Sequence, residues 1–545
     1  MMKKLSLFVF VFVTTLCFSQ VEDALVFLES KDPAVVSAAL ANPLSILTQA
    51  ALDRKYAQGT PIDDRDVPLN ETQKAEINAS TGITVLAKSK WLNAVYVRGT
   101  ENNINNLLNL PFVEDIEFAD KTLNRPTSGK QFTKDKFEVE NELQSRVVYN
   151  YGSATNQTEM IAVDYLHEND FIGQDILVAF MDNGYPGVLT NPAYATLRNE
   201  GRLLGYYDFA ARVENPNGNG SHGASTFSDA AGLLNGQFVG TAPGASYYLY
   251  ITEDSDETPA EEAYWVEALE RADSLGVYVT NTSLGYQDFD NSSYDHTYQD
   301  LDGQTTIAAR GANAAYDKGM INVTSAGNDG RPGDFGYVAT PGDAPGSFTI
   351  GSVNSSGNPS GFSSYGPTVD GRIKPDVVAQ GSSAAVVDQY GNVTTSSGTS
   401  FSSPITAGAV ASLWSAVPHL KNEVVTQAIR ESASRYTNPT DKLGYGIPNF
   451  GEALNALLLL SVEEEMQDTH FALYPNPVST QINISFPKNS DSAEFALFNV
   501  LGEKILITNI TTVQNSVDVS GLASGMYIAS ITSDNKTTSY KIIKK

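Results

Sequence analysis

From about Val147 to Leu460 the sequence alternates short β-rich runs with longer helical ones. Strands that alternate with helices in this way pair as a mostly parallel sheet, and the helices cover it. We therefore expect residues 147–460 to form an α/β domain, with a mostly parallel sheet and helices on both faces. The expected strands are Ile176–Met181, Ser246–Ile251, Val277–Thr280, Ile321–Ser325 and Phe348–Val353, and the expected helices are Ala260–Ser274, Thr305–Lys318, Pro404–Ala416 and Asn422–Ser434.

A smaller region precedes this domain. The chain has 545 residues, more than one hydrophobic core usually supports, so several domains are expected. Residues 20–146 are charged, and they contain three strand-like segments and one short helix-like segment. These are the strands Gly82–Ala87, Trp91–Arg98 and Phe112–Phe118 and the helix Glu101–Leu108, which together predict a small α+β region.

A second small region follows the α/β domain. Residues 461–470 are predicted to be a linker, because acidic residues cluster at Glu463–Glu465. Residues 471–545 then carry short alternating strands separated by turn residues. That pattern predicts a small all-β sandwich.

The first 19 residues have the pattern of a signal peptide. Lys3 and Lys4 precede an apolar run, Leu5–Phe18, that is too short to span a bilayer, and small residues precede Gln20 at the spacing for cleavage. A buried N-terminal strand is the alternative. Cys17 is the one cysteine in the sequence, so the mature protein is expected to have no disulfide and no thiol nucleophile. No later segment is apolar for long enough to predict a transmembrane helix in the mature form.

The overall charge argues against one class of partner. Lys and Arg number 35 against 63 Asp and Glu, which gives a formal net charge of −28. Such an excess repels nucleic acid and anionic membrane surfaces, and it favours solubility outside the cell. We therefore expect no nucleic-acid partner.

Two polar residues of the α/β domain, Asp182 and His222, lie at positions where a side chain can contact a ligand. Asp182 follows the apolar strand 176–181, and the carboxyl edge of such a strand opens into the crevice where doubly wound sheets bind ligands. An aspartate in that place is, by itself, more often a turn former. Among five histidines, His222 is the one in a glycine-flanked loop, Asn219–Gly223, although a single histidine is usually structural.

Two further residues fit the same chemistry. Ser400 lies directly before a helix of small residues, with Pro404 expected in the first turn of that helix. A serine there is usually just a cap, but as a nucleophile it would benefit from a helix N-terminus that favours negative charge on the substrate oxygen. Asn328 follows the strand 321–325, either as a Gly-Asn turn or as a side-chain donor to that oxygen. The order Asp, His, Asn, Ser differs from the Ser, Asp, His order of α/β-hydrolases.

With these residues in this order, the middle region resembles the catalytic domain of the subtilisin-like serine peptidases, the subtilases. The matching blocks are Val178–Gly184, His222–Ser225, Asn281–Gly285, Ser325–Asn328, Phe362–Pro367, Lys374–Ala379 and Gly398–Ser400. Asn183, Ser225 and Phe401 depart from the residues usual in the family. None of the three is a triad or oxyanion group, so these departures bear on substrate preference and leave the expectation of activity intact.

The resemblance implies a serine endopeptidase that hydrolyses peptide bonds of proteins through an acyl-enzyme intermediate. Ser400 is then the nucleophile, His222 its general base, Asp182 the acid that orients His222, and Asn328 an oxyanion donor. The resemblance also implies how substrate binds. The substrate backbone would pair with the segment after the expected strand 277–280, and the specificity pocket for a substrate side chain would have a wall and an uncharged base. These substrate-binding residues are Ser283, Leu284 and Gly285 for the pairing, Ser325, Ala326 and Gly327 for the wall, and Ala339 for the base.

The flanking regions carry resemblances of their own. Trp91–Val95 and Leu110–Val113 resemble parts of the inhibitory propeptide of this family, which makes the chain's own propeptide, residues 20–146, an expected partner. The tail, with Tyr474–Pro477 and the basic end Lys541–Lys545, is similar to the C-terminal sorting domains of type IX secretion. That similarity implies a protein secreted or displayed by a Gram-negative bacterium, carried across the outer membrane by the type IX machinery.

We expect no cofactor and no catalytic metal. Asp300–Gly303 resembles half of a calcium loop, so a structural calcium ion is the alternative to a solvated acidic turn. Two other classes of function stay open: a catalytically silent surface-binding protein on the same fold, and an adhesin whose β-tail is the working part. The sequence does not name the substrate.

Overall fold

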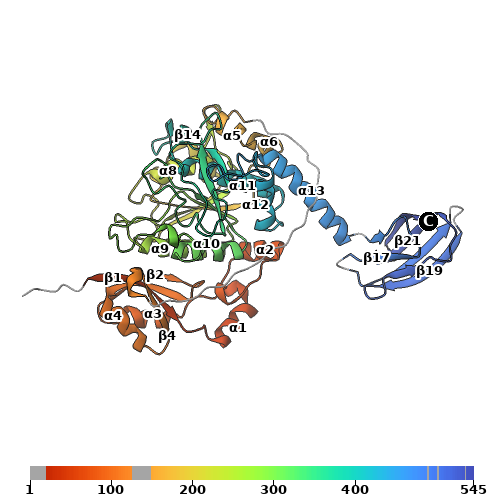
Figure 1. Cartoon of the computed structure of the whole chain (residues 1–545), viewed down its shortest axis with the longest axis horizontal. Helices are drawn as coiled ribbons and strands as arrows, with labels where there is room; N and C mark the ends of the chain where they lie inside the picture. The colour runs from red at the N-terminus through yellow and green to blue at the C-terminus, as the bar shows by residue number, and fades with distance from the viewer. Residues whose placement is uncertain (1–19, 125–148, 470, 488–489, 500–502, 534–535) are drawn as a thin grey trace, which may run out of the picture.

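The computed structural model describes residues 20–124, 149–469, 471–487, 490–499, 503–533 and 536–545, which form three parts along the chain (Figure 1). The predicted signal peptide, residues 1–19, and the predicted boundary between residues 146 and 147 lie outside the described residues. In these described parts, no helix is both long and apolar enough to cross a membrane.

The N-terminal part is a four-stranded antiparallel sheet with strand order β2-β3-β1-β4. The predicted strands and the short helix are confirmed, although β3 begins three residues later than expected because residues 90–93 form the turn that joins it to β2. The elements are β1 (Val21–Leu28), α1 (Pro33–Ala41), α2 (Gln49–Gln58), α3 (Glu71–Asn78), β2 (Ile83–Ser89), β3 (Ala94–Thr100), α4 (Glu101–Asn105) and β4 (Val113–Phe118).

Between β1 and β2 the chain forms three helices that the sequence analysis did not predict. Each begins behind a polar residue whose side chain accepts a backbone N–H of the first turn, namely Asp32, Thr48 and Asn70. Such N-caps satisfy donors that have no partner inside the helix. We call residues 29–82 the helical insertion.

The middle part contains a seven-stranded sheet of order β13-β12-β11-β10-β5-β9-β6, in which every pairing is parallel. The predicted parallel α/β architecture is thereby confirmed. Its strands are β5 (Leu177–Asp182), β6 (Leu203–Asp208), β9 (Ser246–Ile251), β10 (Val279–Thr282), β11 (Ile321–Ser325), β12 (Ser347–Val353) and β13 (Val377–Gln380), with short pairs β7 (Leu233–Leu234), β8 (Phe238–Val239), β14 (Ala384–Val387) and β15 (Val393–Ser396). Its helices are α5 (Thr155–Glu159), α6 (Val163–Glu168), α7 (Ala195–Asn199), α8 (His222–Ala231), α9 (Ala260–Leu275), α10 (Ile307–Asp317), α11 (Thr399–Ala416) and α12 (Asn422–Glu431).

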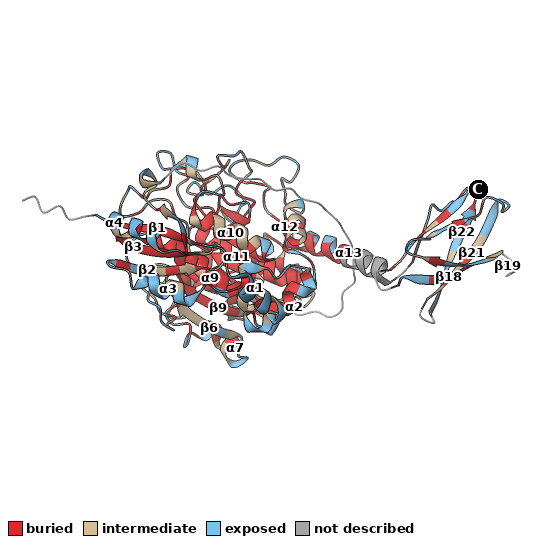
Figure 2. Ribbon diagram, turned by 90° about the horizontal axis from the view of Figure 1, so that it is seen from below, coloured by how far each residue is buried: buried red, intermediate tan, exposed pale blue. Residues whose placement is uncertain are grey.

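Helices cover both faces of this sheet, and each face forms its own core. Figure 2 shows that buried residues are concentrated in this part of the molecule. Val178 and Phe180 of β5 pack in the cluster that includes α8, α11 and α12. Ala179 and Met181 point the other way, into the cluster of α9 and α10, where Tyr96 of the N-terminal sheet also packs. A strand buried on both faces has no polar alternation, which is why β5 is a continuous apolar run.

Helix α11 begins earlier than predicted. The expected start at Pro404 is wrong, because the helix begins at Thr399 and Pro404 lies inside it. Proline lacks the N–H that the Ser400 carbonyl would accept in a regular helix. That carbonyl instead accepts the Ser283 hydroxyl at 2.9 Å, so the helix tolerates the proline.

The C-terminal part confirms the predicted β-sandwich. A three-stranded sheet, β16-β17-β20, and a four-stranded sheet, β19-β18-β21-β22, share one hydrophobic cluster. The strands are β16 (Ala472–Tyr474), β17 (Gln481–Ser485), β18 (Ser492–Asn499), β19 (Lys504–Thr511), β20 (Ser516–Asp518), β21 (Gly525–Ser533) and β22 (Lys536–Lys544). The predicted linker, residues 461–470, is mostly helical, since α13 (Phe450–Thr469) runs through it.

Candidate active site

The structure brings Asp182 and His222 together. Asp182 is the last residue of β5 and is fully buried, whereas His222 is the first residue of α8 and stays partly exposed. Nδ1 of His222 donates to the Asp182 carboxylate, at 2.8 Å from Oδ1 and 3.1 Å from Oδ2. This contact fixes the imidazole tautomer and leaves Nε2 as the acceptor.

Two more donors hold the Asp182 carboxylate in place. The Asn183 N–H donates to Oδ1 at 2.8 Å, and the Thr226 hydroxyl donates to Oδ2 at 3.0 Å. Sequence reasoning missed Thr226. A usable signal was present, because Thr226 follows His222 by four residues on one helix, and residues at that spacing share a face.

The electrostatics of the pair favour a charged imidazole. Burial lowers the pKa of His222, but the charge of Asp182 and the hydrogen bond to it outweigh burial, so the pKa is raised above its ordinary value. A histidine in this setting accepts a proton more readily than a free imidazole would.

Ser400, the second residue of α11, lies next to this pair but is not bonded to it. Its neighbour Phe401 has its ring centroid 5.9 Å from the His222 ring. The Ser400 hydroxyl donates to the Ser283 carbonyl over a long 3.4 Å, and no hydrogen bond joins it to His222 among the described residues. Such contacts are often long without substrate and shorten when substrate binds.

A chain of buried side chains ties α11 to the segment after β10. The Ser283 hydroxyl accepts from Asn281 at 3.0 Å while it donates to the Ser400 carbonyl. Asn281 in turn accepts from the Ser403 hydroxyl at 2.8 Å. The position of the Ser400 backbone is therefore set by the neighbouring strand as well as by its own helix.

Asn328 is held by Thr399, a residue that sequence reasoning did not single out as functional. Its Oδ1 accepts the Thr399 N–H at 2.9 Å and the Thr399 hydroxyl at 3.1 Å. Because a backbone N–H can only donate, the amide oxygen must face Thr399. The Asn328 side-chain NH₂ is left without a hydrogen bond in the described structure. Thr399, which binds the amide oxygen, directly precedes Ser400 in α11.

The structure also brings together the predicted substrate-binding segments. Ser283, Leu284 and Gly285 follow β10, and the Ser325 hydroxyl at the end of β11 donates to the Leu284 carbonyl at 3.4 Å. A methyl group on Gly285 would lie 3.2 Å from the Ala339 Cβ. Ala326 is fully buried, and Gly327 accepts from the Thr399 hydroxyl at 3.1 Å.

The segment Asp300–Gly303, which resembles half of a calcium loop, makes local contacts. The Asp300 carboxylate caps the turn at Thr297 and forms an ion pair of 2.8 Å with Lys121. Asp302 accepts from the backbone of Gln304 and Thr305, at 2.8 Å each. In the described residues no group of three or more His, Cys, Asp or Glu side chains converges in a way that could hold a metal ion. The expectation that no metal ion is needed stays a prediction, with a structural calcium ion as its alternative.

Three family models match the chain. The Subtilase family model covers residues 173–446, a Peptidase S8 propeptide domain of Bacteroidota covers residues 23–136, and a Secretion system C-terminal sorting domain covers residues 472–545. The last match indicates export or display at the cell surface.

Known relatives agree over the middle part. Serine protease AprX of Bacillus subtilis is 28% identical over 298 residues, which are 48% of this chain and 62% of AprX. Subtilisin NAT of Bacillus subtilis subsp. natto is 29% identical over 287 residues, which are 52% of this chain and 67% of that protein. Among solved structures, the MycP3 protease of a type VII secretion system has 19% identity and a TM-score of 0.45, over 58% of this chain and 92% of MycP3. By the model that spans residues 173–446, the chain belongs to the subtilase family.

Proposed function

We propose that this chain is a secreted serine endopeptidase that is made as an inhibited precursor and hydrolyses proteins through an acyl-enzyme. The observation that carries this proposal is the hydrogen bond between buried Asp182 and partly exposed His222, beside the first turn of the helix that bears Ser400. Serine acyl transfer needs this set of nucleophile, base and orienting acid.

In the proposed mechanism Ser400 attacks a peptide carbonyl while Nε2 of His222 takes the hydroxyl proton. The same nitrogen later gives that proton to the leaving amine, and Asp182 stabilises the imidazolium in between. Negative charge on the carbonyl oxygen is met by the Asn328 NH₂ group and the N–H groups at the start of α11. Water then attacks the carbonyl of the acyl-enzyme with His222 again as the base, which releases the acid product and restores Ser400. No cofactor takes part in the proposed mechanism.

Substrate backbone is proposed to add as a strand beside Ser283, Leu284 and Gly285. Such β-addition supplies main-chain hydrogen bonds to any sequence, and the side-chain pockets supply selectivity. Gly285 is exposed, and it lies against Ala339, the proposed base of the pocket for the residue on the acyl side of the cut.

The propeptide part is proposed to be cut off by the enzyme itself and to inhibit it when added back. Its sheet packs on α9 and α10 through Leu25, Trp91 and Tyr96, so it can stay docked after the cut. A full-length protein that is active without processing would contradict this.

The C-terminal sandwich is proposed to direct the protein across the outer membrane of a Gram-negative bacterium by type IX secretion. Its own hydrophobic cluster contains no residue of the middle part, which fits a separately folded export signal.

Labelling with a serine-reactive phosphonate tests the enzyme assignment. We expect the processed protein to be labelled at Ser400, and Ser400→Ala to be folded, unlabelled and inactive on casein. If the processed protein takes no label, a silent binding protein on the same fold becomes the better account. Casein cleavage by pure Ser400→Ala at the parent rate would overturn the triad.

A further inference from the structure

The helical insertion contacts the catalytic domain at the ends of two helices. α9 leads into β10 and α10 leads into β11, so both helices run opposite to the strands. Their C-terminal ends therefore lie at the edge where the strands begin. Asp182 and Ser325 end their strands at the other edge, so this contact is separate from the proposed active site.

The last turn of α9 carries an acidic residue, which is unfavourable at a helix C-terminus. Asp273 lies in the last turn, where the helix dipole disfavours a negative charge, and it is fully buried. The insertion supplies the missing cations: Lys55 Nζ lies 2.8 and 3.1 Å from the two carboxylate oxygens, and the Arg54 guanidinium donates to the same carboxylate. Neither cation has an exposed side chain.

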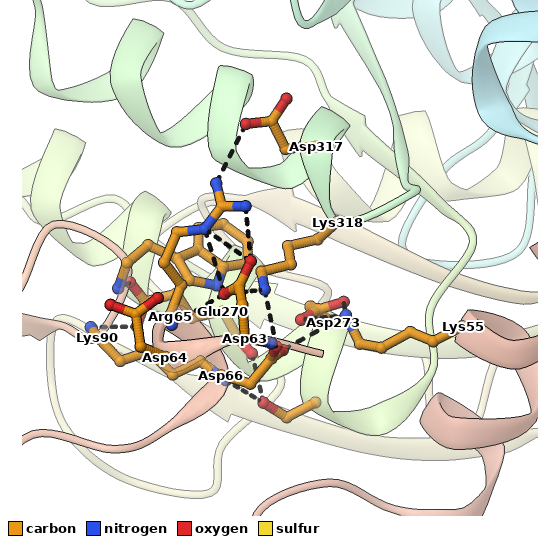
Figure 3. A network of polar contacts seen from close by, with 12 residues as sticks. Lys55, Asp63, Asp64, Arg65, Asp66, Lys90, Glu270, Asp273, Asp317 and Lys318 are labelled. Carbon is orange, nitrogen blue, oxygen red and sulfur yellow. Dashed lines mark hydrogen bonds and ion pairs between the residues drawn. The ribbon is translucent and has the colours of Figure 1, made fainter. Parts of the chain in front are cut away.

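At the end of α10 the charges are reversed. Lys318 caps this helix and is buried, and its ammonium group lies 2.6 Å from Asp63 and 2.7 Å from Asp66 of the insertion. Asp66 also lies 3.4 Å from Lys55, so the two ion-pair groups are joined (Figure 3). The catalytic domain thus presents a buried acid, Asp273, and a buried base, Lys318, and the insertion presents a group of opposite charge to each.

The backbone is shaped for this contact as well. Gly276 ends α9 with φ +93°, and a methyl group there would lie 2.7 Å from the Ala50 backbone. Gly319, after α10, has φ +85°, and a methyl group there would lie 2.6 Å from the Gln58 side chain. The Thr48 N–H donates to the Ser274 carbonyl at 3.0 Å, and so caps a helix end from the other part of the chain.

We propose that Asp273, Ser274, Gly276, Lys318 and Gly319 form a docking surface for the helical insertion, and that this surface holds the propeptide on the catalytic domain after the connecting chain is cut. The proposal deepens the proposed function, because it takes residues 20–124 to be the released inhibitor. A partner with the opposite charge order would bury two like-charge contacts, so the surface selects this propeptide against others. Buried pairs are screened little by salt, so the complex persists at high ionic strength.

The test uses the full chain without its nucleophile, so that the readout does not depend on catalysis. Ser400→Ala carries a recognition sequence for a site-specific protease within residues 125–148. After cutting, the rate at which the propeptide leaves is followed by native mass spectrometry at low and high salt. Failure of the proposed enzyme function would leave this measurement unaffected.

Four variants of this protein decide the outcome. Lys55→Met removes a buried cation, and Lys74→Met is the matched control, because Lys74 pairs with Glu71 inside the exposed helix α3. Asp273→Asn removes the same contact from the catalytic side, so a misfolded propeptide cannot explain both effects. The fourth is the double variant Lys55→Met/Asp273→Asn.

We expect the parent and Lys74→Met to stay associated, and Lys55→Met and Asp273→Asn each to dissociate roughly 30-fold faster or more. The double variant should dissociate more slowly than the two single effects combined would give, because both substitutions remove the Lys55–Asp273 pair. Equal rates for Lys55→Met and Lys74→Met, full additivity in the double variant, or rapid loss of the parent propeptide would each overturn the proposal.

Discussion

Three donors converge on the Asp182 carboxylate: the His222 ring, the Asn183 N–H and the Thr226 hydroxyl. An acid held in this way keeps one orientation, and so does the imidazole bonded to it. Asn328 is fixed in the same manner by Thr399. At the residue scale, the proposed catalytic groups are positioned by neighbours that take no part in the chemistry.

Thr226→Val tests whether the hydroxyl positions Asp182. Valine has the same shape, so packing is kept while one buried acceptor loses a donor, at a cost of about 1–3 kcal/mol in the free energy of unfolding. We expect kcat to fall with KM little changed, and Thr226→Ser to restore kcat. Unchanged kcat in Thr226→Val would show that the other two donors suffice.

The raised pKa of His222 predicts the acid limb of the pH profile. The general base must be neutral, and a raised pKa keeps His222 protonated up to a higher pH than an ordinary histidine. We expect kcat/KM to fall about tenfold per pH unit below an apparent pKa above about 6.5. Asp182→Asn removes the main raising influence, so its residual activity should have an acid limb at lower pH. The same limb in both proteins would contradict this.

Asn328→Ala should lower kcat by about 10²–10³-fold with KM little changed, the magnitude found for one oxyanion donor in a subtilisin. The NH₂ group acts on charge that develops in the transition state, so substrate binding is largely spared. Steady-state kinetics on a peptide substrate measures both constants, and thermal unfolding of the variant serves as the control. A change confined to KM would contradict the assigned role.

At the scale of elements, the sequence predicted strands that position the site, but it did not predict where the helix that carries Ser400 begins. β9 and β11 have the predicted bounds, because each run of strand-forming residues has a glycine two positions before it. The start of α11 was placed five residues late, since Pro404 suggested a first turn. Nothing local to residues 399–404 shows that Ser283, more than a hundred residues earlier, replaces the missing helical bond.

The helical insertion escaped prediction for a related reason. Arg54, Lys55 and Asp66 are types of residue that are usually solvated, yet all three are buried here. Their partners Asp273 and Lys318 lie more than two hundred residues away, so only the folded chain pairs them. The order of Asp182, His222, Asn328 and Ser400 was sufficient to propose a site. Asp182 and Asn328 follow recognisable strands, Ser400 precedes a recognisable helix, and His222 lies in a glycine-flanked loop.

The segment that bears Ala339 predicts a preference for apolar residues on the acyl side of the cut. Ala339 is nearly buried and uncharged, and the nearby acid Asp343 is fully buried and accepts the Gly303 N–H at 2.7 Å. A Lys or Arg side chain entering there would lose hydration without gaining a partner. Discrimination should be broad, about 1–3 kcal/mol per methylene-sized difference.

The measurement compares kcat/KM for matched peptides with Phe, Leu, Lys or Arg at that position. Ala339→Asp provides the control, and it should shift the preference toward Lys and Arg. A preference for Lys or Arg in the unaltered enzyme would show that Asp343, or the exposed Asp334, sets the pocket instead.

At the scale of the whole molecule, the three parts have separate cores but unequal connections. The propeptide shares a hydrophobic cluster and buried ion pairs with the catalytic domain. The C-terminal sandwich has a cluster of its own and follows the long helix α13. The first part is therefore joined to the catalytic domain by buried groups, whereas the last has a hydrophobic core of its own.

Deleting residues 471–545 should therefore trap the protein within the cell envelope while leaving the triad intact. The sandwich carries none of the proposed catalytic groups, so activity released from the envelope fraction should match that of the secreted full-length protein. Activity on casein is measured in the medium and in the envelope fraction, with the intact chain as control. Normal secretion of the shortened chain would mean that the sandwich serves another purpose.

In the proposed maturation, the ion network at the ends of α9 and α10 joins two pieces of chain with different lifetimes. Asp273 and Lys318 would remain in the processed enzyme, whereas their partners Lys55, Asp63 and Asp66 would leave with the propeptide. Natural selection must nevertheless conserve both sides of the network together. Each time the protein is made, a substitution on one side would face its unchanged partner in a buried contact. Among descendants of this chain, substitutions at Lys55 and Asp273 should appear in pairs. The sequence of the propeptide should therefore change in step with the sequence of the catalytic domain it contacts.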